Sequence, residues 1–581
     1  MTEKASAVSE DLRSLAAASF AQIESTLKTL SPQQCAGLLI ECCRVLDYWH
    51  VQVAFAAKPF TTIAYPDFDL IIRGWNLAVS LLVPRFEEMR GIPFQPSTQD
   101  TINRTETLLH NLGRVALLRK TADMIEHGMM EGRSDGDAVI LRMSERVAID
   151  HFLDQMDNDE LDAARRRIPG GDAIDSILER SLAPDIDERM NRLLFPWDTG
   201  RGLMTGYDAE PEVDAHFLGL VSRRAFDLRA EAGIHPDASL GKISGADLVS
   251  VGFMLMSFYL KHIRFVILAK KKYPGINFWM SLTIWKKPEE LFESIAEFTG
   301  IELNKVQAAL DLFTLKREQL EYYAAEAAPF IPMLIKISDG YLLSPVSSIF
   351  RNPFSGVRTT LELQSTKIET SIRHPRESWM SDELIHLFLG NRYYRMEKPT
   401  KLSRNGATVT DVDAAVLDRI TGQIALFQLK WQDFSTHSLK KQKSKARNFV
   451  DQVDDWSGKI ISWVDEFGVE ALCRAIQVPR ADRAKVTAVR LFAIGRLASR
   501  FQSYGYSQKH LETATGTWAQ FVRLREAIGP APDVFSELHQ KLIDERQRSV
   551  ERKPMRHEIQ LMGRTVVFED LWSQFGDDNE D

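Results

Sequence analysis

The segment Thr410–Trp431 constrains the fold more than any other part of this 581-residue chain. Two apolar runs, 412–417 and 424–427, flank a group of turn-forming residues at 418–422. Short apolar runs on either side of such a turn predict an antiparallel β-hairpin. The segment therefore predicts a sheet in the second half of the chain, and its flanking polar residues decide what that sheet could do.

Polar side chains gather at one end of the predicted hairpin. Strand side chains alternate between the two faces, so Gln428 and Lys430 should point the same way. If the turn centres near 420–421, Asp413 falls opposite Gln428 and Asp411 falls opposite Lys430. Opposed residues of an antiparallel pair have Cβ atoms about 4.5–5.5 Å apart. We therefore predict that Asp413, Gln428 and Lys430 converge.

This group suits metal-dependent cleavage of a phosphodiester bond. A carboxylate and an amide oxygen are hard ligands of the kind that Mg²⁺ or Mn²⁺ takes. The metal acidifies a bound water and neutralises charge on the phosphate, and a nearby lysine orients the water and stabilises the transition state. Gln428 brings no charge, so such a site relies on other acids. The alternative interpretation is an ordinary exposed hairpin end.

Asp413, followed by fourteen residues and then Gln428-x-Lys430, resembles the PD-(D/E)XK nuclease superfamily. More narrowly, it resembles the Q-x-K variant of methylation-dependent restriction enzymes and related DNases. The resemblance covers roughly 375–503. It implies a helix before the hairpin, a helix after the lysine and then a further strand, for which 381–389, 442–456 and 485–494 fit. The commonest superfamily pattern has an acid where this chain has Gln428.

The resemblance also implies roles for individual residues. Asp413 and Gln428 would ligate the metal, with the Leu429 carbonyl as a third ligand, and Lys430 would position or activate water. Glu383, in the preceding helix, would support the metal or the water. Two alternatives stay open. Asp411 could replace Asp413 or act behind it, and Glu383 could be a solvated acid, since acids near helix N-termini are favoured anyway.

The charge distribution favours nucleic acid near this hairpin. The whole chain has net charge −8 and pI about 6.0, which argues against a nucleic-acid coat. From residue 391 to 450, however, twelve Lys or Arg stand against five Asp or Glu. A solvated helix face is the alternative interpretation of the basic residues at 440–447. We predict that these basic side chains hold a phosphate backbone: Arg404, Lys440, Lys441, Lys443, Lys445 and Arg447.

The first part of the chain reads as helical. Apolar residues recur at helical spacing over 12–30, 33–57, 101–132, 138–156, 287–298 and 303–327. The run 248–268 is interrupted by Lys261, His262 and Arg264, so it predicts a buried helix rather than a membrane span.

The remaining segments complete the expected organisation. A hairpin around Asp339-Gly340 would be a junction or an addition to the nuclease sheet. We also expect a polar connector at 352–377 and two helices at 506–528 and 533–550. A terminal hairpin at 557–568 and a disordered acidic tail at 576–581 would follow. The predicted division is a helical region at 1–330, a hairpin with connector at 331–374, a nuclease-like domain at 375–535 and a C-terminal part at 536–581.

These features predict a large irregular helical region followed by a restriction-endonuclease-like α/β domain with a mixed sheet. P-loop, H-E-x-x-H and G-x-S-x-G motifs are absent. The four cysteines lack zinc spacing, and the N-terminus lacks a signal-peptide pattern, so we expect a cytoplasmic protein. The expected function is an Mg²⁺-dependent nuclease acting on DNA before RNA, in bacterial defence or repair by analogy. The helical region would select substrate, self-associate or bind a protein partner. The alternative is a catalytically inactive nucleic-acid-binding or scaffold protein.

Overall fold

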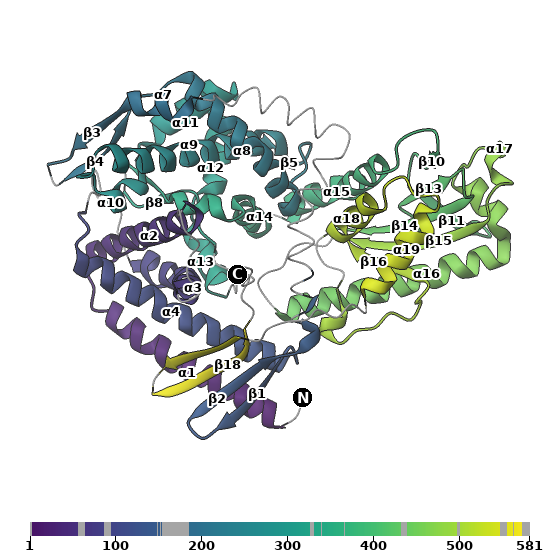
Figure 1. Ribbon diagram of the computed structural model, residues 1–581, viewed down its shortest axis with the longest axis horizontal. Helices are drawn as coiled ribbons and strands as arrows, with labels where there is room; N and C mark the ends of the chain where they lie inside the picture. Colours follow the sequence, from purple (N-terminus) through teal and green to yellow (C-terminus); the bar gives the residue numbers. More distant parts are fainter. Residues whose placement is uncertain are drawn as a thin grey trace, which may run out of the picture.

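Figure 1 shows a large helical region, which carries the N-terminus, beside a smaller region built around a sheet. The computed structural model describes residues 3–55, 64–85, 95–147, 149–150, 153, 185–200, 202–325, 330–338, 340–364, 366–431, 439–496, 500–546, 555–561 and 563–571. The predicted acidic tail lies outside these residues. Mixed helix and sheet, with a helical N-terminal region, therefore agrees with the expected fold class at that level.

Long helices form the first core. They are α1 Glu3–Leu27, α2 Pro32–Phe55, α3 Ala64–Leu82 and α4 Gln99–Glu126. The α3 and α4 helices cross at two glycines, where no side chain separates the backbones. A Cβ on Gly113 would lie 1.8 Å from the carbonyl oxygen of Leu70, and a Cβ on Gly74 would lie 1.9 Å from that of Leu109. The crossing therefore depends on glycine at both positions.

A second set of helices packs around α9, Gly245–Lys272. The other members are α7 Ile186–Leu193, α8 Pro211–Ala232, α10 Phe278–Leu282, α11 Pro288–Thr299, α12 Leu303–Phe313 and α14 Pro353–Gln364. The short helix α13 Leu320–Ala325 packs against α3 in the first core instead. By length and composition α9 could cross a membrane, and 72% of its most apolar window is buried inside the protein. Its burial confirms the predicted core helix at 248–268.

The helical prediction is wrong at residues 130–132 and 138–143. These residues form β1 Met130–Asp135 and β2 Ala138–Met143, an antiparallel pair. Gly136 at the turn has φ +59°, and buried Val139 and Leu141 alternate with more accessible neighbours, which is a strand period. The predicted C-terminal hairpin is present as β17 Met555–Leu561 and β18 Arg564–Leu571. It joins β2 through β18, so the end of the chain returns to the helical region (Figure 1).

The hairpin near residue 340 belongs to the helical region. Its strands are β8 Ile335–Lys336 and β9 Leu342–Ser344, and β9 also pairs with β7 Ile284–Lys286. The idea that it extends the C-terminal sheet is therefore wrong. The predicted connector at 352–377 is wrong as well. That segment is helical, in α14 and the first half of α15 Thr366–His386, because Phe354, Val357 and Leu361 recur at helical spacing and are buried. Two short hairpins complete this region: β3 Leu194–Asp198 with β4 Leu203–Tyr207, and β5 Ser239–Leu240 with β6 Ile243–Ser244.

The C-terminal sheet has the strand order β10-β13-β14-β15-β16. Its strands are β10 Tyr393–Arg395, β13 Ala414–Asp418, β14 Gln423–Lys430, β15 Ala488–Gly495 and β16 Thr513–Thr517. The first three are antiparallel, and β15 and β16 run parallel to β14. A separate pair, β11 Thr400–Arg404 and β12 Ala407–Val412, precedes β13. Strand β16 corrects the prediction that 506–528 is all helix, since its side chains complete the sheet core instead.

Helices cover both faces of this sheet. On one face, α15, α18 Trp518–Ile528 and α19 Val534–Glu545 enclose a core rich in phenylalanine. On the other face lies α16 Leu439–Ala475, whose Trp456 and Ile460 share a core with Ile424 and Leu426 of β14. A short α17, Arg480–Arg483, precedes β15. Gln428 follows Ile424 and Leu426 in the two-residue period of β14, so its side chain lies on the α16 face.

Candidate functional site

Asp413 lies where the chain passes from one small sheet to another. Strand β12 ends at Val412 and β13 begins at Ala414. The Asp413 N–H donates to the carbonyl of Phe427 at 3.1 Å, next to the register pair Ala414 and Phe427. Asp413 therefore lies opposite Gln428, as the predicted turn position requires.

The Asp413 carboxylate is held by the strand opposite. Its Oδ2 accepts hydrogen bonds from the Leu429 N–H at 2.7 Å and from Gln428 Nε2. Gln428 is buried, with 3% of its surface exposed. Within the described part of the chain, neither Asp413 Oδ1 nor Gln428 Oε1 accepts a hydrogen bond. Two oxygens at this point are thus available to a ligand.

Burial raises the pKa of Asp413 to about 6, and the nearby Asp411 carboxylate acts in the same direction. The Leu429 N–H, the Lys430 ammonium and the Gln428 amide oppose the shift by favouring the ionised form. Lys430 therefore lies close enough to act electrostatically on Asp413. A buried carboxyl with a perturbed pKa beside a lysine is a candidate functional group.

Asp411 is exposed, and its strand pairs with a different neighbour from the one predicted. It belongs to β12, where it pairs with Lys401 of β11. The prediction that Asp411 lies opposite Lys430 is wrong, because β12 leaves the main sheet at Asp413 and pairs with β11. Its carbonyl accepts a hydrogen bond from Trp456 Nε1 of α16 at 2.7 Å, which fixes the end of β12.

Glu383 reaches an arginine that the sequence analysis did not single out. Its carboxylate forms an ion pair with Arg496, which is buried at the end of β15. The guanidinium of Arg496 lies 4.7 Å from the ring centroid of Trp431 and 5.3 Å from that of Trp518, and its backbone N–H donates to the Lys430 carbonyl at 2.8 Å. Arg496 is therefore coupled to the lysine strand. Only the register of β14 against β15 could have indicated it.

The predicted basic residues do not form one group. Arg404 forms an ion pair with Glu466 and contacts Ser462 Oγ at 3.5 Å. A helix rises about 1.5 Å per residue, so this point on α16 lies roughly 20–35 Å from its N-terminal lysines. Near that N-terminus Lys440 is exposed, and Lys443 donates to a backbone carbonyl of α4's C-terminal end at 3.4 Å. Arg447 is exposed and lies 3.6 Å from an acid one turn on, Lys445 is partly buried, and the Lys441 side chain is outside the described atoms.

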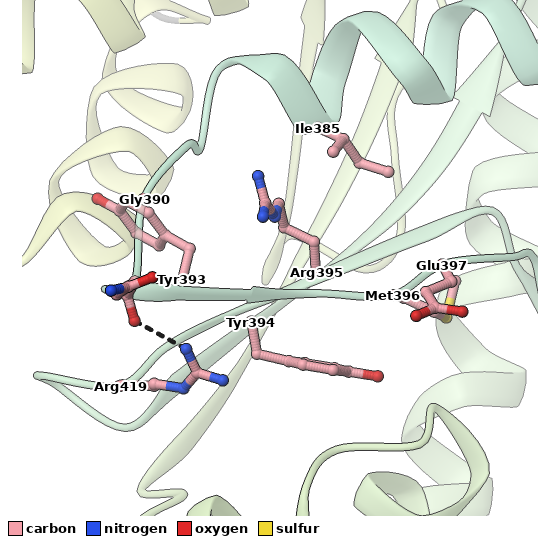
Figure 2. Close-up of a pocket in the computed structure, with 9 residues that line it drawn as sticks. Ile385, Gly390, Tyr393, Tyr394, Arg395, Met396, Glu397 and Arg419 are labelled. Carbon is pink, nitrogen blue, oxygen red and sulfur yellow. Dashed lines mark hydrogen bonds between the residues drawn. The ribbon is translucent and has the colours of Figure 1, made fainter.

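A cavity of about 430 Å³ lies along the edge strand β10. Figure 2 shows Arg395 directed toward Ile385 of α15, with Tyr394 on the other side of the strand. Arg419 closes one end by donating to the Asn391 carbonyl at 2.7 Å. Asp413, Gln428 and Lys430 do not line this cavity, so it is separate from the candidate site.

The donor set around Asp413 fits a hard cation with several waters. In a strand the N–H and C=O of one residue point the same way, so the Leu429 carbonyl faces Asp413 as its N–H does. One charged and two neutral oxygens suit Mg²⁺, which keeps part of its water shell. Over the described ranges, no three His, Cys, Asp or Glu side chains gather as a metal cluster. No protein family, curated protein or solved structure matches the chain.

Proposed function

We propose that this protein hydrolyses phosphodiester bonds in nucleic acid, DNA before RNA, at Asp413, Gln428 and Lys430. The observation that carries the proposal is the contact of the Asp413 carboxylate with Gln428 and the Leu429 N–H. It joins a partly buried acid to the strand that bears Lys430. Mg²⁺ or Mn²⁺ is the cofactor that this donor set would hold.

The order of elements supports the same proposal. Helix α15 precedes the antiparallel strands β10, β13 and β14, helix α16 follows them, and β15 then pairs in parallel with β14. This is the helix, hairpin, helix and strand that the resemblance implies for a restriction-endonuclease-like domain over 375–503. The assignment of a restriction-endonuclease-like fold to this domain is therefore part of the proposal.

Each residue of the site has a proposed task. Asp413 supplies the charged oxygen, and Gln428 and the Leu429 carbonyl supply neutral ones. When bound, the metal would acidify a water and neutralise charge on the scissile phosphate. Lys430 would orient the attacking water and stabilise the negative charge of the transition state. Glu383, which is ion-paired with Arg496, would position that arginine and the strand end rather than ligate directly.

A second candidate function is nucleic-acid binding without cleavage. Two observations favour it: Gln428 carries no charge, and Glu383 is engaged by Arg496. Asp413 then remains as the single buried carboxylate among the proposed ligands. In that case the helical region would be the working part, as a scaffold or a sensor for a protein partner or a second copy.

We place the function in the cytoplasm, with bacterial defence or repair as the setting suggested by analogy. The four cysteines are buried free thiols, which fits a reducing compartment. The absence of a motor motif from the sequence is consistent with a nuclease whose helical region, rather than an NTPase, controls access to substrate.

The test is cleavage of plasmid and single-stranded DNA with Mg²⁺ or Mn²⁺. We expect cutting by the wild type and by the control Lys459→Ala, whose lysine is exposed on α16 and pairs with Asp455. We expect Lys430→Ala and Asp413→Ala to lose it. DNA binding that persists in EDTA, without cutting by the wild type, would favour the non-catalytic candidate. Cutting that survives in both variants would refute the assignment of the site.

A further inference from the structure

A small cavity lies where the helical region meets the end of strands β15 and β16. Arg146 reaches it from the helical region, Arg500 from the segment after β15, and Arg546 from the end of α19. About 20 Å³ of it is open to the centre of a water-sized group, whereas one ordered water needs about 10–15 Å³. The cavity therefore has room for one small polar group but not for a nucleobase or a sugar.

Among the described residues, positive charge exceeds negative charge around this cavity. Arg523 approaches from α18, and with the other three arginines it makes four guanidinium groups near two carboxylates, those of Asp150 and of Glu545, which itself lines the cavity. The carboxylates are already engaged, because Asp150 lies 2.7 Å from Arg146 and Glu545 lies 2.6 Å from Arg523. Within the described part of the chain, the arginines of this cluster thus outnumber its carboxylates by two.

The guanidinium groups are also removed from water. Burial lowers the pKa of Arg500 to about 10, and it lowers that of Arg546 to about 10. In the described part of the chain, the Nε atoms of Arg146 and Arg546 are buried and lack a hydrogen-bond acceptor. A buried cation without full compensation is unfavourable, so an anion in the cavity would be strongly stabilised.

The shape of the donors selects the class of anion. A guanidinium presents a planar fork of N–H groups that matches the oxygens of a phosphate. Thr515 and Gln520 add neutral polar groups to the lining, and Gln520 lies in the first turn of α18, where the helix dipole also favours negative charge. The lining therefore suits a tetrahedral oxyanion.

The cavity lies close to the candidate site. Gln428 pairs with Ala493, and Ala493 pairs with Thr515, so these residues form one row across three parallel strands. Neighbouring strands are about 4.8 Å apart, which puts Thr515 roughly 10 Å from Gln428. Residues paired in this way point to the same face of the sheet. The cavity therefore lies near the candidate site, with the buried Ala493 between the two.

We propose that this arginine cavity binds the oxyanion of a phosphate group and so links the helical region to the sheet. The link already has a polar part, because the Ser503 N–H donates to Asp150 at 3.2 Å across the same junction. The proposal goes beyond the proposed function, since phosphate binding requires no cleavage. The phosphate is either part of a nucleic-acid strand or a free ion.

The first test is a calorimetric titration of the full-length protein with inorganic phosphate at constant ionic strength. We expect one saturable site in the wild type. Arg146→Gln and Arg546→Gln should each weaken it at least tenfold, and Arg546→Lys, which keeps the charge and loses the fork, should lie between. The matched control is Arg474→Gln on α16, whose arginine is exposed and pairs with Glu470, and its affinity should stay within twofold. Circular dichroism checks that each variant is folded.

A second arm identifies the source of the phosphate. Displacement of a bound single-stranded oligonucleotide by inorganic phosphate, with both ligands weakened in Arg546→Gln, supports a nucleic-acid phosphate. Saturable phosphate binding without displacement supports a free ion. No saturable binding by the wild type, or equal affinities in the wild type and both glutamine variants, overturns the proposal. Lys430→Ala should bind phosphate normally, so loss of cleavage and loss of the anion site are separate results.

Discussion

Replacing Asp413 by asparagine should stabilise the metal-free protein while removing the proposed cleavage activity. The carboxylate is partly buried near Asp411, and its pKa is raised to about 6 from an ordinary value of 3.8. Because folding raises this pKa, the Asp413 carboxyl adds to the free energy of unfolding below pH 3.8, and this addition is lost as the pH rises through 6. Each pKa unit corresponds to about 1.4 kcal/mol, so ionisation at pH 8 lowers the free energy of unfolding by about 3 kcal/mol.

Asparagine keeps the shape and can accept the same hydrogen bonds from Gln428 and Leu429 through its carbonyl oxygen. We therefore expect Asp413→Asn to exceed the wild type in stability by up to about 3 kcal/mol at pH 8 and by less than about 1 kcal/mol at pH 4. The assay is urea unfolding in EDTA, followed by tryptophan fluorescence, across that pH range. A variant that is less stable at pH 8, or a difference that does not change with pH, would contradict the electrostatic account.

The same pair of proteins tests the metal without measuring cleavage. A ligand at ten times its dissociation constant stabilises the state that binds it by about 1.4 kcal/mol. Mg²⁺ should therefore raise the stability of the wild type at pH 8 and leave Asp413→Asn nearly unchanged. Equal stabilisation of both proteins would place the cation elsewhere.

Two further predictions concern the helical region. Gly113→Ala should lower the free energy of unfolding by about 1–3 kcal/mol, because the new methyl group overlaps a carbonyl of α3. The control Gly340→Ala, which meets open space, should change it by less than about 0.5 kcal/mol in the same urea titration. Burial lowers the pKa of His262 to about 4 from 6.5. The contribution of His262 to the free energy of unfolding is therefore complete above pH 6.5, and about 3 kcal/mol of it is lost as the pH falls toward 4. His262→Asn should flatten that part of the stability profile, and an unchanged slope would refute the assignment.

The hairpin at the candidate site could be predicted because its information is local. The turn at 418–422 sets the register, and the register alone puts Asp413 opposite Gln428. The position of Asp411 could not be predicted in the same way. It depends on whether the strand continues past Asp413 or pairs with β11, and both choices satisfy the same alternation of side chains. In the folded protein β12 pairs with β11, and Trp456 of α16 donates a hydrogen bond to the Asp411 carbonyl at the end of β12.

Errors in the helical region have a related cause. Residues 138–143 and 353–364 are short segments that each pack against a distant part of the chain. β2 pairs with the neighbouring β1 and also with the distant β18, and α14 packs its buried face against the α9 core. The distant partners, β18 and α9, cannot be read from the local pattern. Short apolar runs are ambiguous between strand and helix for this reason, and tertiary contacts settle the outcome.

The functional residues also divide into those with a local sequence signal and those that only long-range contacts bring together. Asp413, Gln428 and Lys430 lie within eighteen residues and are visible as a spacing, so a resemblance could suggest them. Arg496 becomes visible only through the register of β15 with β14, and Arg146 and Arg546, four hundred residues apart, only through the folded chain. If the arginine cavity binds a phosphate of the nucleic acid, contacts to the proposed substrate come from chain segments that no motif joins. Recognition would then reside in the junction between the two regions, and the motif would supply the chemistry alone.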